Sequence, residues 1–166
     1  MEAKYKKQSG EHGQYGHVKM RFEPSGDMKK SYIFAEEIVG SAVPKNYFPA
    51  VEKSMQESVQ AGQLAAYPVV GVKAVLYDGS YHPVDSSEMA FKTATVMAFK
   101  KGFMEAGPVL LEPIVTMKVT VPDKYTGDIM GDLNKRRGRV LGMNPDRSGN
   151  TIIEAEAPEL EIYGYS

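Results

Sequence analysis

Three glycines recur at intervals of three near the start of the chain, in Ser9-Gly10-Glu11-His12-Gly13-Gln14-Tyr15-Gly16. A nucleotide-binding glycine loop has a strand before it and a helix after it, so that the helix N-terminus meets phosphate. This segment instead precedes residues 17–22, whose apolar and polar residues alternate and predict a half-buried strand with a basic outer face. The pattern supports no nucleotide site. It leaves either a loop that brings backbone N–H groups to a partner and presents His12, Gln14 and Tyr15, or a structural hairpin.

A second segment with candidate chemistry surrounds His82, in Asp78-Gly79-Ser80-Tyr81-His82-Pro83. Asp78-Gly79 predicts a two-residue hairpin turn, after which residues 80–84 return as a strand. Asp85 and Glu88 have the spacing of a capping box that opens the next helix. His82 would then lie at a helix N-terminus, a place that favours anions.

Metal binding and hydrolysis are the sharper alternatives for the histidines, which are His12, His17 and His82. None of the three has the H-x-x-x-H or H-E-x-x-H spacing of a metal-binding helix, so the pattern disfavours a metal. Asp85 and the serines beside it could suggest a catalytic triad, but no G-x-S-x-G elbow accompanies them. We therefore predict neither a catalytic residue nor a metal site.

A basic cluster, Asn134-Lys135-Arg136-Arg137-Gly138-Arg139, begins in the last turn of a predicted helix and ends in the turn to the next strand. Cations suit the last turn of a helix, Gly138 fits its C-cap, and such a turn would suit a phosphate-rich partner. Upstream, Gly127 and Gly131 share one face of that helix, which indicates a close approach to the sheet or to a partner. We favour packing on the sheet.

The composition limits the classes of protein further. The chain has 166 residues, 42% of them hydrophobic, with 20 Lys+Arg against 21 Asp+Glu and no cysteine. These numbers favour a folded chain and exclude disulfides, thiolate metal sites and a uniformly basic surface. No apolar run reaches the roughly 18 residues of a membrane span, and residues 1–7 are no secretory signal. We expect a soluble, cytoplasmic protein that does not bind membranes.

These segments must be positioned by two domains of the α+β class. The apolar pattern restarts after a proline-bounded stretch, residues 108–113, so we expect domains at residues 1–110 and 111–166. The first should hold strands and two helices, and the second a β-α-β-β pattern followed by an unfinished element. We expect strands at residues 17–22, 31–35, 69–77, 115–121, 140–143 and 151–157, and helices across residues 48–59, 86–106 and 122–137.

Several motifs, in the same order along nearly the whole chain, together resemble bacterial elongation factor G. They are Lys7-Gln8-Ser9-Gly10, Gly13-Gln14-Tyr15-Gly16-His17-Val18, Val43-Pro44, Pro49-Ala50-Val51, Tyr67-Pro68-Val69-Val70, Tyr77-Asp78-Gly79-Ser80-Tyr81-His82, Val84-Asp85-Ser86-Ser87-Glu88-Met89-Ala90-Phe91-Lys92, Leu111-Glu112-Pro113-Ile114, Gly127-Asp128-Ile129-Met130-Gly131-Asp132-Leu133-Asn134 and Arg136-Arg137-Gly138.

The resemblance implies a fragment of two α/β sandwich domains. Residues 1–110 would be the family's fourth domain, which is like the second domain of small-subunit ribosomal protein five, with its opening strand missing. Residues 111–166 would be an incomplete, ferredoxin-like fifth domain that is truncated at its C-terminus. The GTPase domain would be absent, so the chain itself is expected to be no enzyme and to hold no cofactor, while GTP and Mg²⁺ would belong to the absent domain.

The resemblance also implies a partner, the ribosome, on which the family promotes tRNA–mRNA translocation. The fourth domain would enter the decoding region of the small subunit, at its A site, with two tip loops that match residues 9–15 and 80–85. The implied tip residues are Gln8, Ser9, Gly10, Glu11, His12, Gly13, Gln14, Tyr15, Ser80, Tyr81, His82 and Asp85. The fifth domain would contact large-subunit rRNA near the sarcin–ricin loop and the stalk base. Its implied contacts are Asn134, Lys135, Arg136, Arg137 and Arg139.

One departure keeps other functions open. Typical members have Gly-Gly-Arg-Gly where this chain has Gly10-Glu11-His12-Gly13, which also resembles an elongation factor G-like paralog. The alternatives are such a paralog, or a ribosome-protection or recycling factor, without efficient translocation. A small-molecule kinase with the same fold is a further class, which the missing phosphate loop disfavours. The missing last strand would leave residues 114–121 with an unpaired edge and allow self-association.

Overall fold

The computed structural model describes residues 1–9 and 12–165. The chain divides into two compact units, Met1–Val109 and Leu110–Ser166. Each unit combines one sheet with helices, which confirms the predicted α+β class.

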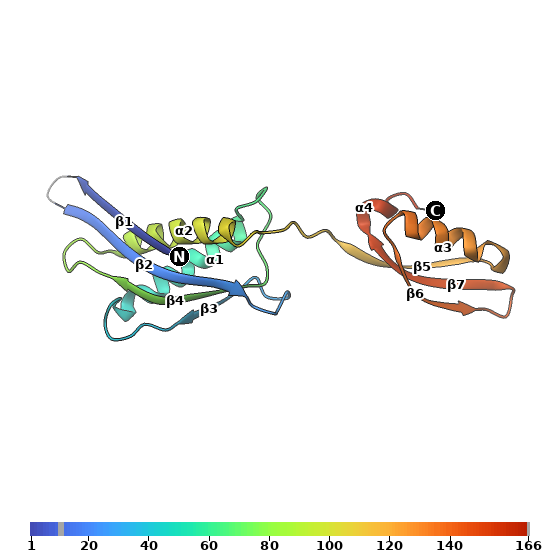
Figure 1. The fold of residues 1–166 in the computed structure, drawn as a ribbon, viewed down its shortest axis with the longest axis horizontal. Helices are drawn as coiled ribbons and strands as arrows, with labels where there is room; N and C mark the ends of the chain where they lie inside the picture. Colours follow the sequence, from blue (N-terminus) through green and yellow to red (C-terminus); the bar gives the residue numbers. More distant parts are fainter. Residues whose placement is uncertain (10–11, 166) are drawn as a thin grey trace. The chain divides into compact units, whose positions relative to one another are not determined.

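The first unit is a four-stranded sheet covered by two helices (Figure 1). Its strands are β1 (Glu2–Ser9), β2 (His12–Pro24), β3 (Tyr32–Glu36) and β4 (Val72–Ser80), in the spatial order β1-β2-β4-β3. The β1–β2 and β2–β4 pairs are antiparallel, and β3 pairs with β4 in parallel. Helix α1 (Phe48–Ala61) follows the short 3₁₀ turn η1 (Lys45–Tyr47), and α2 is Glu88–Glu105.

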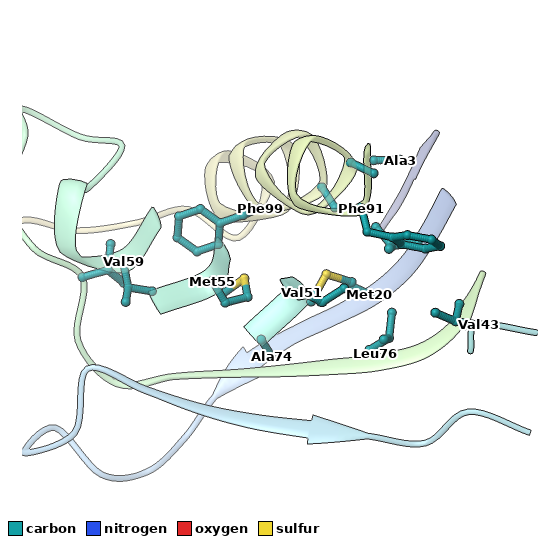
Figure 2. Close-up of a cluster of buried hydrophobic side chains, with 14 residues drawn as sticks. Ala3, Met20, Val43, Val51, Met55, Val59, Ala74, Leu76, Phe91 and Phe99 are labelled. Atoms are coloured by element: carbon teal, nitrogen blue, oxygen red, sulfur yellow. The ribbon is translucent and has the colours of Figure 1, made fainter. Parts of the chain in front are cut away.

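The core of this unit lies between the sheet and the two helices (Figure 2). The predicted spacing of Val51, Met55 and Val59 places all three on the buried face of α1. Helix α2 contributes Phe91 and Phe99, both fully buried. Strands β2 and β4 supply Val18, Met20, Ala74 and Leu76 from the same face of the sheet. Alternation along β2 therefore leaves its polar residues on the outer face.

The second unit has the predicted strand-helix-strand-strand order. Strand β5 (Ile114–Pro122) leads through the turn η2 (Asp123–Tyr125) into α3 (Thr126–Lys135), then β6 (Arg139–Pro145), β7 (Asn150–Pro158) and α4 (Glu159–Ile162). The sheet order is β5-β7-β6, with both pairs antiparallel. Within residues 1–9 and 12–165, β5 pairs on one side only, with β7. Leu133, Ile153 and Ala155 form its small buried core.

Two local predictions are wrong. Asp78-Gly79 does not form a turn, because both residues continue β4, and residues 80–84 do not return as a strand. Gly79 pairs with Val18, and a Cβ at Gly79 would overlap the carbonyl oxygen of His17. Glycine is therefore present for a close approach of two strands. The tip loop that the resemblance implied over residues 9–15 is wrong at Ser9 and at residues 12–15, which are strand in the β1–β2 pair, while residues 10 and 11 lie outside the described residues.

Candidate nucleic-acid interface

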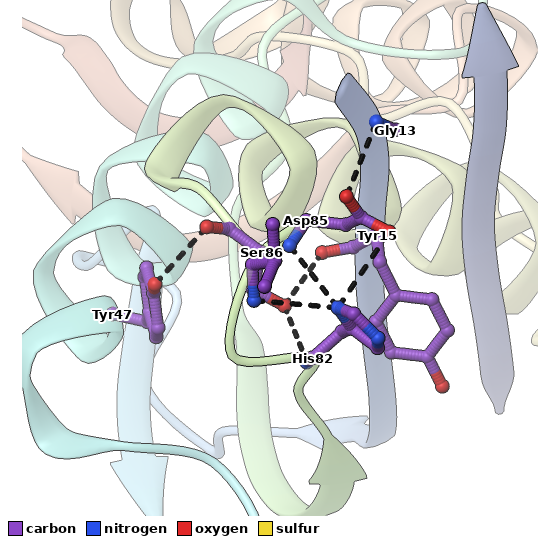
Figure 3. A network of polar contacts seen from close by, with 7 residues as sticks. Gly13, Tyr15, Tyr47, His82, Asp85 and Ser86 are labelled. Atoms are coloured by element: carbon purple, nitrogen blue, oxygen red, sulfur yellow. Dashed lines mark hydrogen bonds and ion pairs between the residues drawn. The ribbon is translucent and has the colours of Figure 1, made fainter. Parts of the chain in front are cut away.

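One end of the first unit is formed by the β1–β2 hairpin and the loop that connects β4 to α2. The Tyr15 N–H donates to the Asp85 carbonyl at 2.8 Å, and the Ser86 hydroxyl donates to the Tyr15 carbonyl at 2.9 Å (Figure 3). Tyr15 and Ser86 also form an isolated parallel β-bridge. The two segments that the resemblance implied as one tip, separated by about 70 residues in the chain, are thus joined through their backbones.

Asp85 joins the hairpin instead of capping a helix. Its carboxylate accepts from the Gly13 N–H at 3.1 Å, across 72 residues of sequence. The N-cap of α2 is Ser87, whose side chain accepts from the Ala90 N–H at 3.1 Å. The predicted capping box is therefore wrong by two positions, because the hairpin provides a donor for Asp85 that the local sequence does not reveal.

Glycines make this junction close. A Cβ at Gly13 would lie 2.9 Å from the Asp85 carboxylate, and one at Gly16 would lie 2.5 Å from the Ala90 carbonyl oxygen. The Asp85 carboxylate is a side-chain end that can shift, but the Ala90 contact is with backbone, so it is Gly16 that permits α2 to begin against β2. Of the two interpretations left open, the structure favours the structural hairpin at these positions. Its backbone groups are used within the unit.

The His82 ring is held in one orientation by the backbone. Its Nδ1 accepts from the N–H groups of Val84 at 3.3 Å and Asp85 at 3.2 Å, while the backbone N–H of His82 donates to the Ser86 hydroxyl at 2.8 Å. A neutral ring that accepts at Nδ1 carries its proton on Nε2. The side chain is 52% exposed, and its ring centroid lies 6.4 Å from that of Tyr15. His82 can therefore offer a hydrogen-bond donor and a ring face to a partner.

Tyr15 and Ser80 belong to a chain of side-chain hydrogen bonds on the outer face of the sheet. The Tyr15 hydroxyl lies 2.7 Å from the Ser80 hydroxyl, which lies 2.7 Å from His17 Nδ1. On its other side, His17 Nε2 lies 2.8 Å from a Glu2 carboxylate oxygen. Glu2 and His17 were not among the predicted site residues. A strand prediction for residues 2–9 would have paired them with β2, but Lys4-Tyr5-Lys6-Lys7 carries too little apolar alternation to indicate one.

The remaining predicted tip residues are less defined. Gln14 and Tyr81 are exposed at the same end. Gly10 and Glu11 lie outside the described residues, as do the side chains of Gln8, Ser9 and His12.

The basic turn of the second unit follows α3. The left-handed residue that ends the helix is Arg137, with φ of 57°, and the C-cap is Arg136 rather than the predicted Gly138. The Gly138 N–H donates to the Leu133 carbonyl at 2.7 Å, and the Arg137 N–H donates to the Asn134 carbonyl at 3.2 Å. These two bonds form a Schellman motif with an arginine where glycine is usual.

Acidic groups of the same unit pair with the three arginines of this turn. Arg137 contacts Glu112 at 2.5 Å and Glu161 at 3.1 Å, and its guanidinium lowers the pKa of the Glu112 carboxyl. The further pairs are Arg136 with Asp132 at 2.8 Å and Arg139 with Glu156 at 3.0 Å. Lys135 and Asn134 are exposed and have no side-chain partner within the described part of the chain. The predicted cluster of four cations is thus largely neutralised by neighbouring carboxylates.

Residues 1–9 and 12–165 hold neither a metal-binding cluster nor a membrane-spanning helix. No group of three or more His, Asp or Glu residues there could hold a metal ion. Among the same residues, no helix combines the length and hydrophobicity needed to cross a bilayer.

Comparisons with known proteins agree with this architecture. Residues 1–107 match the family model "Elongation factor G, domain IV", and residues 109–166 match "Elongation factor G C-terminus". Neither domain is the nucleotide-binding part of those proteins. A crystal structure of a protein from Thermus thermophilus is 46% identical, with a TM-score of 0.83 over 99% of this chain and 24% of that chain. This chain therefore spans about a quarter of that protein's length, and it belongs to the elongation factor G family.

Proposed function

We propose that this chain is the ribosome-binding, C-terminal part of a translational GTPase that promotes tRNA–mRNA translocation. The first unit would enter the A site of the small subunit with its tip, and the second would contact large-subunit rRNA near the sarcin–ricin loop and the stalk base. The chain itself would be no enzyme. GTP and Mg²⁺ would bind elsewhere in the parent protein, and the setting would be the cytoplasm.

The preformed tip is the observation that carries this proposal. Two segments distant in sequence meet at one end of the unit, fixed by hydrogen bonds from Gly13 and Tyr15 to Asp85. A tip that is already ordered loses little conformational entropy when it binds RNA. His82, held by backbone N–H groups and half exposed, adds a donor and a ring that can stack on a base.

Replacing His82 in the intact parent protein tests the role of the tip. We expect His82→Ala to slow translocation more than it weakens ribosome binding, because a tip contact made late in the reaction stabilises the transition state. Rapid kinetics of mRNA movement and equilibrium binding to the same ribosomes measure the two effects. Tyr67→Phe, at an exposed tyrosine outside the tip, is the control. Equal losses would show that His82 is only an anchor.

The basic turn is proposed as the large-subunit contact. Four contributing cations would give a log–log salt slope on the order of −3 for ribosome binding, and changing Lys135, Arg136, Arg137 and Arg139 to Ala should flatten it. Because three of these residues already pair with carboxylates, we expect Lys135→Ala to account for much of the change. An unchanged slope would indicate that the RNA contacts lie elsewhere, on the basic outer face of β2.

A second candidate, a paralog that binds the ribosome without efficient translocation, is favoured by Glu11-His12 in place of Gly-Arg. An acid and a histidine in place of Gly-Arg lower the positive charge of this segment, which would face RNA. Changing Glu11-His12 to Gly-Arg in the parent protein should then raise the translocation rate with little change in binding. If the wild type already translocates efficiently, this second candidate is wrong.

A further inference from the structure

The chain of side chains from Glu2 to Tyr15 has a defined hydrogen-bond direction. An ionised Glu2 can only accept, so His17 Nε2 must carry a proton and donate to it over 2.8 Å. In a neutral ring Nδ1 then has a lone pair and accepts from the Ser80 hydroxyl at 2.7 Å. Because the Ser80 proton already lies in the bond to His17, the Ser80 oxygen accepts from the Tyr15 hydroxyl, also at 2.7 Å. While His17 is neutral, Tyr15 therefore directs its proton inward and offers only lone pairs to a partner.

A proton added to His17 reverses this order. The proton comes from solvent and binds Nδ1, which now donates to Ser80. The Ser80 hydroxyl turns and donates to Tyr15, and the Tyr15 proton turns outward, while the bond from Nε2 to Glu2 is unchanged. No heavy atom has to move. His17 is 9% exposed, so its ring meets these partners with little competition from water.

Two lysines lie beside the Tyr15 side chain, whose hydroxyl this reversal controls. Lys4 Nζ lies 5.3 Å from the centroid of the Tyr15 ring, and Lys6 is the register partner of Tyr15 on the same face of the sheet. Both lysines are exposed. The charged groups that face His17 are Glu2 and Lys4 on β1, Lys19 on β2 and Asp78 on β4, the last two in an ion pair of 3.0 Å.

We propose that Lys4, Lys6 and the Tyr15 hydroxyl form a site for an RNA phosphate oxygen, with Glu2 and His17 as positioning residues that turn the hydroxyl into a donor when His17 is protonated. The proposal rests on the proposed function, because the RNA is ribosomal. It adds to that function a contact on the outer face of the β1–β2 hairpin, coupled to proton uptake. A phosphate accepts and cannot donate, so it selects the protonated order.

Ribosome binding at two pH values tests the coupling. When the pH is lowered from about 8 to about 6, the affinity of the wild type should rise by up to about tenfold more than that of Tyr15→Phe. Tyr15→Phe keeps His17 and both lysines, so any simple attraction between a charged His17 and RNA survives in it. Ser80→Ala should lose the same pH dependence, and Tyr67→Phe should retain it.

The possible outcomes separate this inference from the proposed function. Equal pH dependence in wild type and Tyr15→Phe would overturn the proposed relay, in which protonation of His17 turns the Tyr15 hydroxyl outward through Ser80. It would leave ribosome binding intact. Absence of ribosome binding at every pH would instead overturn the proposed function and, with it, the RNA site. The relay is tested without ribosomes by the ¹⁵N NMR shifts of His17 in the free chain. These should show a neutral ring protonated at Nε2 at high pH, and a ring protonated at Nδ1 would contradict the assigned direction.

Discussion

The glycines inside the described strands and helices of the two units occupy opposite environments. In the first unit, added Cβ atoms at Gly13, Gly16 and Gly79 would meet polar or backbone atoms at 3 Å or less. In the second, Cβ atoms at Gly131 and Gly142 would meet nothing within 4 Å. The first unit therefore depends on close contact between its backbone segments. The second has space around the glycines of its helix α3 and strand β6 and depends on other interactions.

Those other interactions are a small core and surface ion pairs. Leu133, Ile153 and Ala155 are its buried apolar cluster among the described residues, whereas the first unit buries apolar side chains from both helices and three strands. Exposed ion pairs such as Arg137 with Glu112 stabilise weakly. The comparison indicates a rigid first unit that presents the tip and a second unit with a smaller margin of stability.

The largest effect is expected at Leu133, which is fully buried. Leu133→Ala should cost about 4 kcal/mol and unfold the second unit while the first remains folded. NMR signals of each unit, followed in urea, measure the two transitions separately. Leu141→Ala, at a half-exposed side chain of β6, should change stability by only about 0.5 kcal/mol. Simultaneous loss of both units would refute the independence that the comparison assumes.

At Gly16 the expected loss is smaller and falls on the other unit. Gly16→Ala should destabilise the first unit by about 3 kcal/mol, because its Cβ would collide with the carbonyl at the start of α2. The matched change Gly142→Ala, in an open strand position, should cost much less. Urea denaturation of both variants measures the difference, and a tolerated Gly16→Ala would show that α2 can move away from β2.

A substitution at Gly131 should increase the stability of the second unit. The glycine lies inside α3 with open space around it, so the predicted packing on the sheet is wrong there. Gly131→Ala should stabilise the second unit by up to about 1 kcal/mol. A fall in ribosome binding together with a rise in stability would support the other alternative, in which the helix face of Gly127 and Gly131 approaches a partner.

The smallest effect concerns pH. Arg137 lowers the pKa of Glu112 in the folded state, so the stabilisation is present above the unfolded value of about 4.3 and is lost as the pH falls through the lower, folded value. The urea midpoint of the second unit should therefore fall in acid, and fall less in Glu112→Gln. Glu159→Gln, at an exposed carboxylate of the same unit, serves as the control. An identical fall of the urea midpoint in Glu112→Gln would show that this ion pair does not contribute to the stability of the second unit.

The elements that could be predicted from the sequence are those that a local repeat of apolar residues determines. Alternation at residues 17–22 and 115–121 predicted strands, and the spacing of Val51, Met55 and Val59 predicted the buried face of α1. These patterns succeed because one buried face requires a repeat of two or about 3.6 residues.

The predictions that failed depend on partners distant in sequence. Asp85 finds its donor 72 residues away, at Gly13. Arg137 is accommodated in a left-handed conformation beside Glu112 and Glu161, which lie 25 and 24 residues away. Asp78-Gly79 has the local signal of a turn, but the approach of β2 makes it a strand. Propensity alone contains none of these contacts.

Directed cleavage of ribosomal RNA tests the central claim, that the tip of the first unit and the basic turn of the second bind different ribosomal subunits. The chain has no cysteine, so Tyr81→Cys and Lys135→Cys each give one attachment point for an iron chelate that generates hydroxyl radicals. We predict cleavage of small-subunit rRNA around the A site from position 81, and of large-subunit rRNA near the sarcin–ricin loop from position 135. Cleavage from position 81 confined to the large subunit, or none above that of the unlabelled chain, would contradict the account.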